Sequence, residues 1–411
     1  MSLILGMMTG LCLCGAAMAE TFTLTEALNR AADYDPSRRA GVHHIESAQA
    51  AVRQANVKPN PTIGVDVENL GGSGSYSLLD RSETTVYYQQ TLERGGKRQA
   101  RTDLAQIDVD IAQLRLARTR LDLFETVEKL WVEAQAADAF VAIAEDRLNT
   151  AQKAQAEVKR RVTAARDPLF AGTAADTEVA QAQIALDMAR SKAAEAKFAV
   201  AAYWGGDSGF DLDMTGFAST SLPDLLNDPG TSLDVRLLER QRDSARARIR
   251  LEQTRTTQDV SVKGGVRYFG DGGDAAFIVG GSIPLGRNDT NRGNIERASA
   301  DQAAAEADIE LSRTTALRTR ARLIAKLTMT AQEITRIDAE TLPPAERTLD
   351  LVREGYARGG FRHTDVIDAM KVIDTVKARR IDLLKTFHLD LATLNRLDGR
   401  YAGLAQSDIQ P

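Results

Sequence analysis

The chain has 411 residues, a formal net charge of −5 and only 5% aromatic residues, and it is rich in alanine, leucine, arginine and acidic residues. That composition is typical of long amphipathic helices and argues against globular domains built on thick aromatic cores. Basic residues alternate with acidic ones along the chain, so no basic patch is expected and we predict no nucleic-acid partner.

The first segment, residues 1–19, is predicted to be a signal peptide. Its apolar run ends in the small-x-small pattern Ala-Met-Ala before Glu20, as a cleavage site requires. No lysine or arginine precedes the apolar run, so a buried N-terminal helix is the alternative. Both cysteines, Cys12 and Cys14, lie in this segment, and the mature chain is therefore expected to have no disulfide, cysteine ligand or lipid-bearing cysteine.

The mature chain repeats one order of elements twice. Residues 20–204 and 233–398 each predict a helix, a strand pair, a very long charged helix, a break and another long helix. Residues 205–232 link the two repeats, and residues 399–411 form a C-terminal tail. The predicted fold is mainly α with a small β part, an elongated and duplicated chain with long coiled-coil helical hairpins.

The long helices carry narrow apolar seams. Residues 102–162 contain no proline and no glycine, and their apolar residues recur at spacings of three and four. A helix of that length is a rod of about 90 Å, which must pair with other helices along its length. Two hairpins in one chain give too thin a core, so self-association is expected. In the second repeat the predicted seam is Ile309, Ala316, Leu323, Leu327, Ile334 and Ile337, followed by Val366, Met370, Ile373, Leu384, Phe387, Leu391 and Leu394.

Four segments alternate apolar and polar residues as β-strands do. They are residues 61–69, 84–92, 260–269 and 275–285. Their lengths suit strands that cross an outer membrane, where open sheet edges are not tolerated, so several chains must share one barrel. Two ordinary soluble hairpins are the alternative. The predicted interfacial aromatic residues are Tyr87, Tyr88, Tyr268, Phe269 and Phe277.

These features together resemble the TolC family of outer-membrane efflux proteins, over essentially the whole mature chain. The resemblance is carried by the duplication, the strand pairs, the Leu-Pro-Pro-Ala segment at 342–345 before a Tyr-Ala-x-Gly break, and the Asp-Val-Ile-Asp-Ala restart at 365–369. Asn60-Pro61 and the segments 68–72 and 92–98 are similar to the heavy-metal, CzcC-type branch of RND efflux.

The resemblance implies a homotrimer in the Gram-negative outer membrane, in contact with its lipid. Each chain would give four strands to a twelve-stranded β-barrel and its helices to a periplasmic α-barrel, with residues 205–233 and the tail forming an equatorial belt. The implied function is the exit duct of a tripartite pump, docked to a periplasmic adaptor and driven by an inner-membrane RND transporter, with heavy-metal cations as cargo. A drug-efflux duct, a type I secretion duct and a soluble periplasmic coiled-coil scaffold or adaptor are the alternatives.

The same resemblance assigns the expected site residues. Asp365 and Asp368 match acidic residues that ring the periplasmic aperture, although aspartates at a helix start also complement the helix dipole. Tyr356 matches a tyrosine that helps hold the aperture shut. Its family partner arginine is replaced by Phe361, with Arg362 beside it. Gly359 and Gly172 match the hairpin turns where the adaptor docks.

No residues form a pattern typical of an enzyme. The chain has no nucleophile elbow, phosphate loop or zinc motif, so we predict neither catalysis nor a cofactor. Its four histidines, His43, His44, His363 and His388, lack a second ligand at helical spacing. Each is therefore expected to be hydrogen-bonded or solvated, and no metal site is predicted.

Overall fold

A computed structural model describes residues 21–77, 79, 81–222 and 232–406. The predicted signal peptide, with both cysteines, lies outside these residues. The chain divides into two compact units, and each unit draws on both sequence repeats. The hairpin unit comprises Met1–Asp35, Phe124–Pro223 and Lys326–Ala392, and the sheet unit comprises Pro36–Leu123, Asp224–Ala325 and Thr393–Pro411.

Three helices contribute residues to both units: α3 (Lys97–Thr163), α6 (Arg292–Arg336) and α8 (His363–Leu397). The remaining elements of the hairpin unit are β1 (Thr21–Phe22), α1 (Leu24–Tyr34), α4 (Leu169–Ala201), β4 (Asp211–Leu212), the π-turn η3 (Ile337–Thr341) and α7 (Leu342–Arg358). Those of the sheet unit are α2 (Pro36–Ala55), β2 (Thr62–Glu68), η1 (Gly74–Tyr76), β3 (Glu83–Leu92), α5 (Leu233–Thr254), β5 (Val260–Phe269), β6 (Ala275–Ser282) and α9 (Ala402–Gln406).

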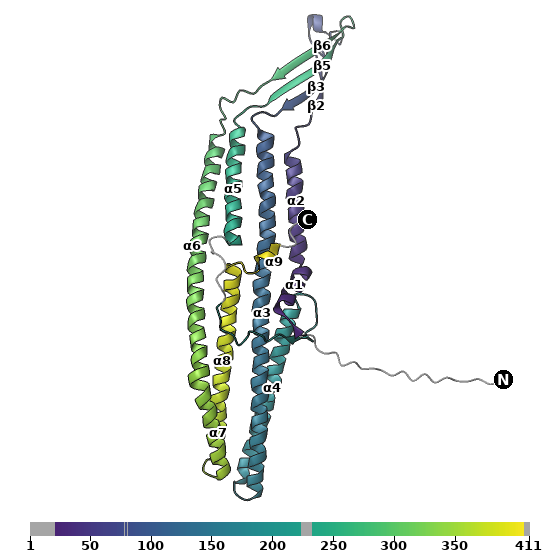
Figure 1. The fold of residues 1–411 in the computed structure, drawn as a ribbon. Helices are drawn as coiled ribbons and strands as arrows, with labels where there is room; N and C mark the ends of the chain where they lie inside the picture. Colours follow the sequence, from purple (N-terminus) through teal and green to yellow (C-terminus); the bar gives the residue numbers. More distant parts are fainter. Residues whose placement is uncertain (1–20, 78, 80, 223–231, 407–411) are drawn as a thin grey trace, which may run out of the picture. The chain divides into compact units, whose positions relative to one another are not determined.

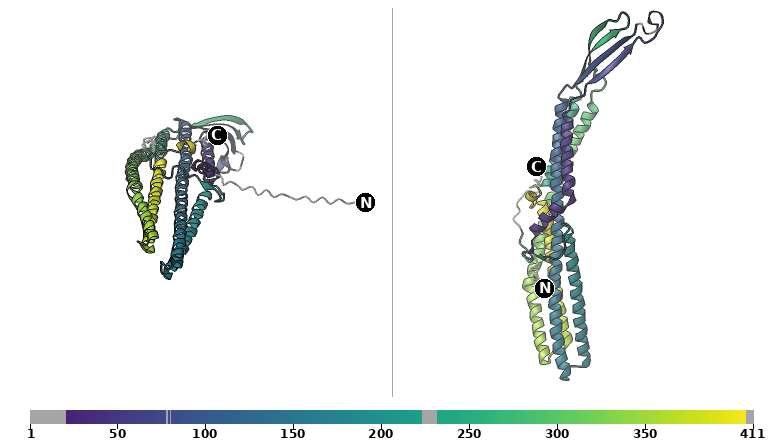
Figure 2. Two further views of the ribbon diagram at one scale, coloured as in Figure 1. Left: turned by 60° about the horizontal axis from the view of Figure 1, so that its bottom comes forward. Right: turned by 90° about the vertical axis from the view of Figure 1, so that its right-hand side faces the viewer.

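The hairpin unit is built from two helical hairpins. The end of α3 packs beside α4, and α7 packs beside α8, in all the views of Figures 1 and 2. The predicted seam of the second repeat is buried at every position except Leu391, which is half-buried. The long helix of the first repeat begins at Lys97, five residues before the predicted start, because the glycines at 95 and 96 end the strand exit. The seam periodicity therefore predicted the faces along which these helices pair.

The long helix of the second repeat is not uniform. A π-turn at Ile337–Thr341 interrupts it, and α7 then begins with Pro343 and Pro344 in its first turn. Proline lacks a backbone N–H and clashes with the preceding turn of an α-helix, so the wider turn accommodates the pair.

The described part of the segment that links the repeats packs on helices of the hairpin unit. Gln135 on α3 donates to the Asp213 carbonyl at 2.6 Å, and the His388 Nε2 atom on α8 lies 2.8 Å from the Phe217 carbonyl oxygen. Phe22 lies against Trp204 and Phe210, with ring centroids at 5.3 Å and 5.4 Å. Phe22, Trp204 and Phe210 thus form an aromatic cluster where the linker meets the helices.

The sheet unit carries one antiparallel sheet with the strand order β2-β3-β5-β6. The strands match the predicted segments, except that the last one ends at Ser282 and not at residue 285. Gly265 on β5 permits a close approach of neighbouring strands, because a Cβ there would lie 2.2 Å from the Val86 carbonyl oxygen.

The two faces of the sheet differ in chemistry. Directly opposed residues share a face, and one face is almost wholly apolar and exposed. Val279 and Phe277 on this apolar face are 91% and 90% exposed. The other members of the apolar face are Ile63, Val65, Val67, Val86, Tyr88, Val262, Val266 and Tyr268.

The opposite face of the sheet is polar. Arg267 donates to Thr85 at 2.9 Å and to Glu83 at 2.7 Å, and it pairs with Glu68 at 2.8 Å. Tyr87 lies on this polar face with the Lys263 ammonium 4.9 Å from its ring centroid. Tyr87 and Phe269 are therefore not on the face that presents the other predicted interfacial aromatics.

None of the helices within the described residues is both long enough and apolar enough to span a membrane.

Candidate gate at the helical hairpin tips

Two turns close the tips of the two hairpins. In the first, α3 ends at Thr163 and α4 begins at Leu169, with Ala165 at a φ of 55° and the Arg166 N–H donating to the Arg161 carbonyl at 2.8 Å. In the second, Gly359 takes a φ of 86° and caps α7. The N–H groups of residues 359 and 360 donate to the carbonyls of residues 356 and 355 at 2.9 Å and 2.8 Å, which is the pattern of a Schellman motif.

A network of three side chains joins the two tips. The Arg161 guanidinium donates to both carboxylate oxygens of Asp167, at 3.0 Å and 3.1 Å. The Tyr356 hydroxyl donates to Asp167 Oδ2 at 2.7 Å. Arg161 also donates to the Tyr356 carbonyl at 2.8 Å and stacks 4.6 Å from the centroid of its ring. We call these three residues the tip latch, because two of them come from the first hairpin and the third from the second.

The surroundings of the tip latch favour its closed form. Hydrogen bonds from the Arg161 guanidinium hold the pKa of Asp167 below its usual range. Burial and the hydrogen bond to Asp167 raise the pKa of Tyr356, so the phenol keeps its proton. The side chains of Arg161 and Asp167 are each 13% exposed, and this partial burial strengthens their attraction relative to a pair on the surface.

His363 lies beside the tip latch at the start of α8. Its ring centroid is 5.8 Å from that of Tyr356, and both of its ring nitrogens are buried without a hydrogen-bond partner. Burial lowers the pKa of His363, against the opposing effect of the Asp167 and Glu178 carboxylates. The expectation that every histidine is hydrogen-bonded or solvated is therefore wrong for His363, because packing against the tyrosine excludes a partner.

The two predicted aperture aspartates have different surroundings. Asp365 is half-buried and accepts the Arg362 backbone N–H at 2.8 Å, as an N3 residue does in a capping box. Asp368 is exposed. Asp365 thus has the helix-start role that the sequence offered as an alternative, and Asp368 is free of such a role.

The two predicted docking glycines also differ. Gly359 lies in its turn as expected. Gly172 does not lie in a turn, because it is the fourth residue of α4 and has nothing near the position of an added Cβ. The break of the first repeat covers residues 164–168 and therefore ends before Gly172. Phe361, at the place of the family arginine, packs on Gly355, where an added Cβ would lie 2.1 Å from the phenylalanine ring.

Sequence reasoning missed Arg161 and Asp167 as partners of Tyr356. Both flank the break of the first repeat, and Tyr356 precedes the aligned break of the second. The alignment of the two breaks was the available signal, since a duplicated hairpin places its two tips at equivalent ends. Within the described residues, no three His, Cys, Asp or Glu side chains gather as a metal site.

Comparison with known proteins places this geometry among outer-membrane components. The profile of the family OEP, "Outer membrane efflux protein", matches residues 27–206 and 230–400. The solved structure of CusC, described in terms of transmembrane channel formation, superposes with a TM-score of 0.71 at 17% identity and covers 91% of each chain.

Two relatives are similar in sequence. The cobalt-zinc-cadmium resistance protein CzcC of Cupriavidus metallidurans is 26% identical over 387 residues, which are 93% of this chain and 91% of CzcC. The nickel-cobalt-cadmium resistance protein NccC of Alcaligenes xylosoxydans xylosoxydans is 30% identical over 289 residues, which are 68% of this chain and 64% of NccC.

Proposed function

This chain belongs to the outer membrane efflux protein family and is an outer-membrane efflux channel with periplasmic helices, and from that premise we propose that it is the exit duct of a tripartite pump for divalent heavy-metal cations. Three copies would share one barrel, a periplasmic adaptor would bind the hairpin tips, and an inner-membrane RND transporter would supply the energy. No catalytic step is involved.

The two-faced sheet is the observation that best supports the exit-duct proposal. Ten exposed apolar or aromatic side chains on one face and an ion-paired polar face on the other suit a strand group with lipid outside and water inside. A soluble scaffold leaves that apolar face in water, which is costly for a patch of this size. Four strands have two open edges, so closure in lipid calls for further copies of the chain.

The cargo proposal rests on the named relatives. CzcC and NccC are called resistance proteins for cobalt, zinc, nickel and cadmium. Deletion of the gene should sensitise cells to these cations more than to hydrophobic drugs, and the intact gene should restore resistance. The measurement is a comparison of minimal inhibitory concentrations for zinc, cobalt, nickel and cadmium with those for dyes and antibiotics. A strain sensitised only to dyes and antibiotics would place the protein in a drug-efflux pump.

We further propose that the hairpin tips are the periplasmic aperture and the surface to which the adaptor docks. The tip latch holds neighbouring hairpins together, so its separation would widen an opening that they surround. Leu169 and Phe170, beside Gly172, are 84% and 74% exposed, as apolar contacts for a partner helix would be. Gly359 provides the tight turn of the second tip.

Acidic residues near this aperture would favour cations. Three copies of Asp365 and Asp368 around a narrow opening would focus a negative potential. Because Asp365 forms an ion pair with the Arg362 guanidinium at 3.5 Å, Asp368 should carry most of the effect. Asp368→Asn should therefore lower cation over anion selectivity in planar bilayers, and Asp365→Asn should lower it less. Glu346→Gln, which removes an exposed charge from α7, is the matched charge control. Equal selectivity in all three variants would contradict the aperture role.

A further inference from the structure

A second feature of the sheet unit is a groove where the strands meet the helices. The groove has a volume of 820 Å³ and is lined by the segments 57–61, 90–93 and 96–99. Gln90 and Leu92 lie on the same side of β3 as Val86 and Tyr88, because side chains alternate along a strand. The groove therefore opens at the end of the apolar face.

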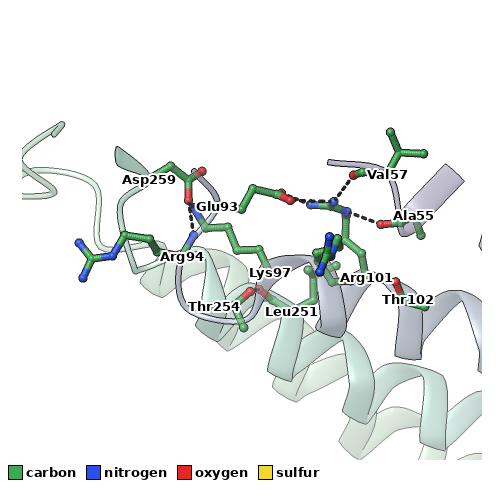
Figure 3. A network of polar contacts seen from close by, with 11 residues as sticks. Ala55, Val57, Glu93, Arg94, Lys97, Arg101, Thr102, Leu251, Thr254 and Asp259 are labelled. Atoms are coloured by element: carbon green, nitrogen blue, oxygen red, sulfur yellow. Dashed lines mark hydrogen bonds and ion pairs between the residues drawn. The ribbon is translucent and has the colours of Figure 1, made fainter. Parts of the chain in front are cut away.

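The charges around the groove are partly paired. Arg101 forms a two-contact ion pair with Glu93 and also donates to the Ala55 and Val57 carbonyls at 3.2 Å and 3.3 Å, as Figure 3 shows. Lys97 pairs with Asp259 at 2.8 Å. These pairs neutralise Glu93, the acidic residue that lines the groove.

Two cations lining the groove remain unneutralised. Lys58 is exposed and Arg98 is half-buried, and neither has an acidic partner within ion-pair distance among the residues that the structure describes. The other end of the sheet differs, because Arg81 there is paired with Asp271 at 3.4 Å and Asp274 adds a negative charge. The unpaired cations that line the groove thus lie at the end of the sheet that leads into the helices.

We propose that this groove binds the phosphate of an anionic phospholipid in the inner leaflet of the outer membrane, with Lys58 and Arg98 as the recognising cations. The inference rests on the proposed function, because it needs the apolar face to lie in lipid. A phospholipid beside that face places its acyl chains on Val86 and Tyr88 and its phosphate at the end of the strands. Arginine and lysine both bind phosphate oxygens. Gln99 donates one amide hydrogen to Asp103 at 2.7 Å, and its second amide hydrogen offers a further donor beside them.

The test measures lipid retained by the full-length protein in detergent, by native mass spectrometry with phosphatidylglycerol and phosphatidylcholine as probes. The wild type should retain phosphatidylglycerol in preference to phosphatidylcholine. The double variant Lys58→Gln/Arg98→Gln should bind phosphatidylglycerol more weakly by about fivefold per charge removed. Arg318→Gln/Arg322→Gln, which removes two exposed charges from α6, is the matched control and should bind as the wild type does.

Three results would overturn the proposal. They are equal loss in both double variants, equal retention of the two lipids by the wild type, and displacement of the bound lipid by inorganic phosphate, which would assign the groove to a free anion. A separate variant, Val279→Trp, reports whether the apolar face is in lipid at all. If brominated acyl chains quench its fluorescence while the protein retains lipids without a headgroup preference, the groove inference fails and the proposed membrane channel stands. If brominated acyl chains do not quench its fluorescence, the membrane placement of the apolar face is itself contradicted.

Discussion

The two ends of α3 use the same chemistry for opposite purposes. Near its start, Arg101 makes a two-contact ion pair with Glu93 and binds the carbonyls of Ala55 and Val57. Near its end, Arg161 makes a two-contact ion pair with Asp167 and binds the carbonyl of Tyr356.

The partners of the two arginines explain the difference. The partners of Arg101 belong to neighbouring segments of the sheet unit that join strand to helix. The contact therefore holds this strand–helix junction in place, and we call it the joint. The partners of Arg161 belong to two separate hairpins, and Tyr356 lies 189 residues beyond Asp167 in the chain. The two hairpins also share a buried core, which includes Val158 and Ala171 from the first and Leu349 and Val366 from the second. We expect the polar contact at the tips to break without unfolding either hairpin, because each hairpin keeps its own pair of helices.

The largest effect should come from breaking the joint. Arg101→Ala leaves Glu93, whose side chain is 14% exposed, without its partner and removes two hydrogen bonds to carbonyls. The free energy of unfolding should fall by about 2–4 kcal/mol. Thermal unfolding of the purified protein measures this change. Arg94→Gln, which changes an exposed neighbour, is the control. An unchanged Tm for Arg101→Ala would contradict a stabilising role for the ion pair at the joint.

Breaking the latch should open the tips with little cost to the fold. Tyr356→Phe removes the hydrogen bond to Asp167 but keeps the ring beneath Arg161. A hydrogen bond to a charged group contributes about 1.5 kcal/mol or more, so the open fraction should rise by about tenfold. Single-channel conductance in planar bilayers measures the open fraction, with Tyr76→Phe in a loop of the sheet unit as the control. An open fraction equal to that of the wild type contradicts a latch role for the hydroxyl.

The two glycines of the tips should respond in opposite directions to alanine. Gly359→Ala places a side chain at a φ of 86° and should destabilise the second tip by about 1 kcal/mol. Gly172→Ala, inside α4 with open space around it, should stabilise the first tip by about 0.5–1 kcal/mol. Hydrogen exchange of the amides in each tip reports both changes. Destabilisation by both substitutions would mean that Gly172 also serves the turn.

The smallest effect should be a dependence of the latch on pH through His363. Burial lowers the pKa of His363, because the buried site disfavours the charged imidazolium. The neutral ring therefore stabilises the closed tips above the ordinary histidine pKa of about 6.5, and this stabilisation is lost as the pH falls through the lowered pKa. The Asp167 carboxylate keeps its charge in this range because its pKa is lowered too. Channel open fraction should rise a few-fold between about pH 7.5 and pH 5.5.

The substitution His363→Gln should remove that rise, and His43→Gln, an exposed histidine in the sheet unit, should leave it unchanged. A rise that persists in His363→Gln would assign the pH dependence to other groups.

The sequence by itself determined the elements of this protein. The alternation of apolar residues predicted four strands to within a few residues, and the seam spacing predicted the buried faces of α6 and α8. These features are local, because the period of the side chains follows directly from the backbone geometry of a helix or a strand. The duplication and the short motifs then gave the family, which the profile match confirms.

Only the tertiary structure decided which side chains meet. Three features depend on such contacts: the pairing of Tyr356 with Asp167 and Arg161, the buried ring of His363, and the cation-lined groove beside Lys58. In each of them, the residues that meet are distant in the chain or lie on either side of a turn. The exact residues of the first turn also escaped prediction, since Ala165 adopts a left-handed conformation that its residue type does not favour. Periodicity fixes the face on which a residue lies, whereas the contact it makes depends on the packing of a second element whose position no local pattern encodes.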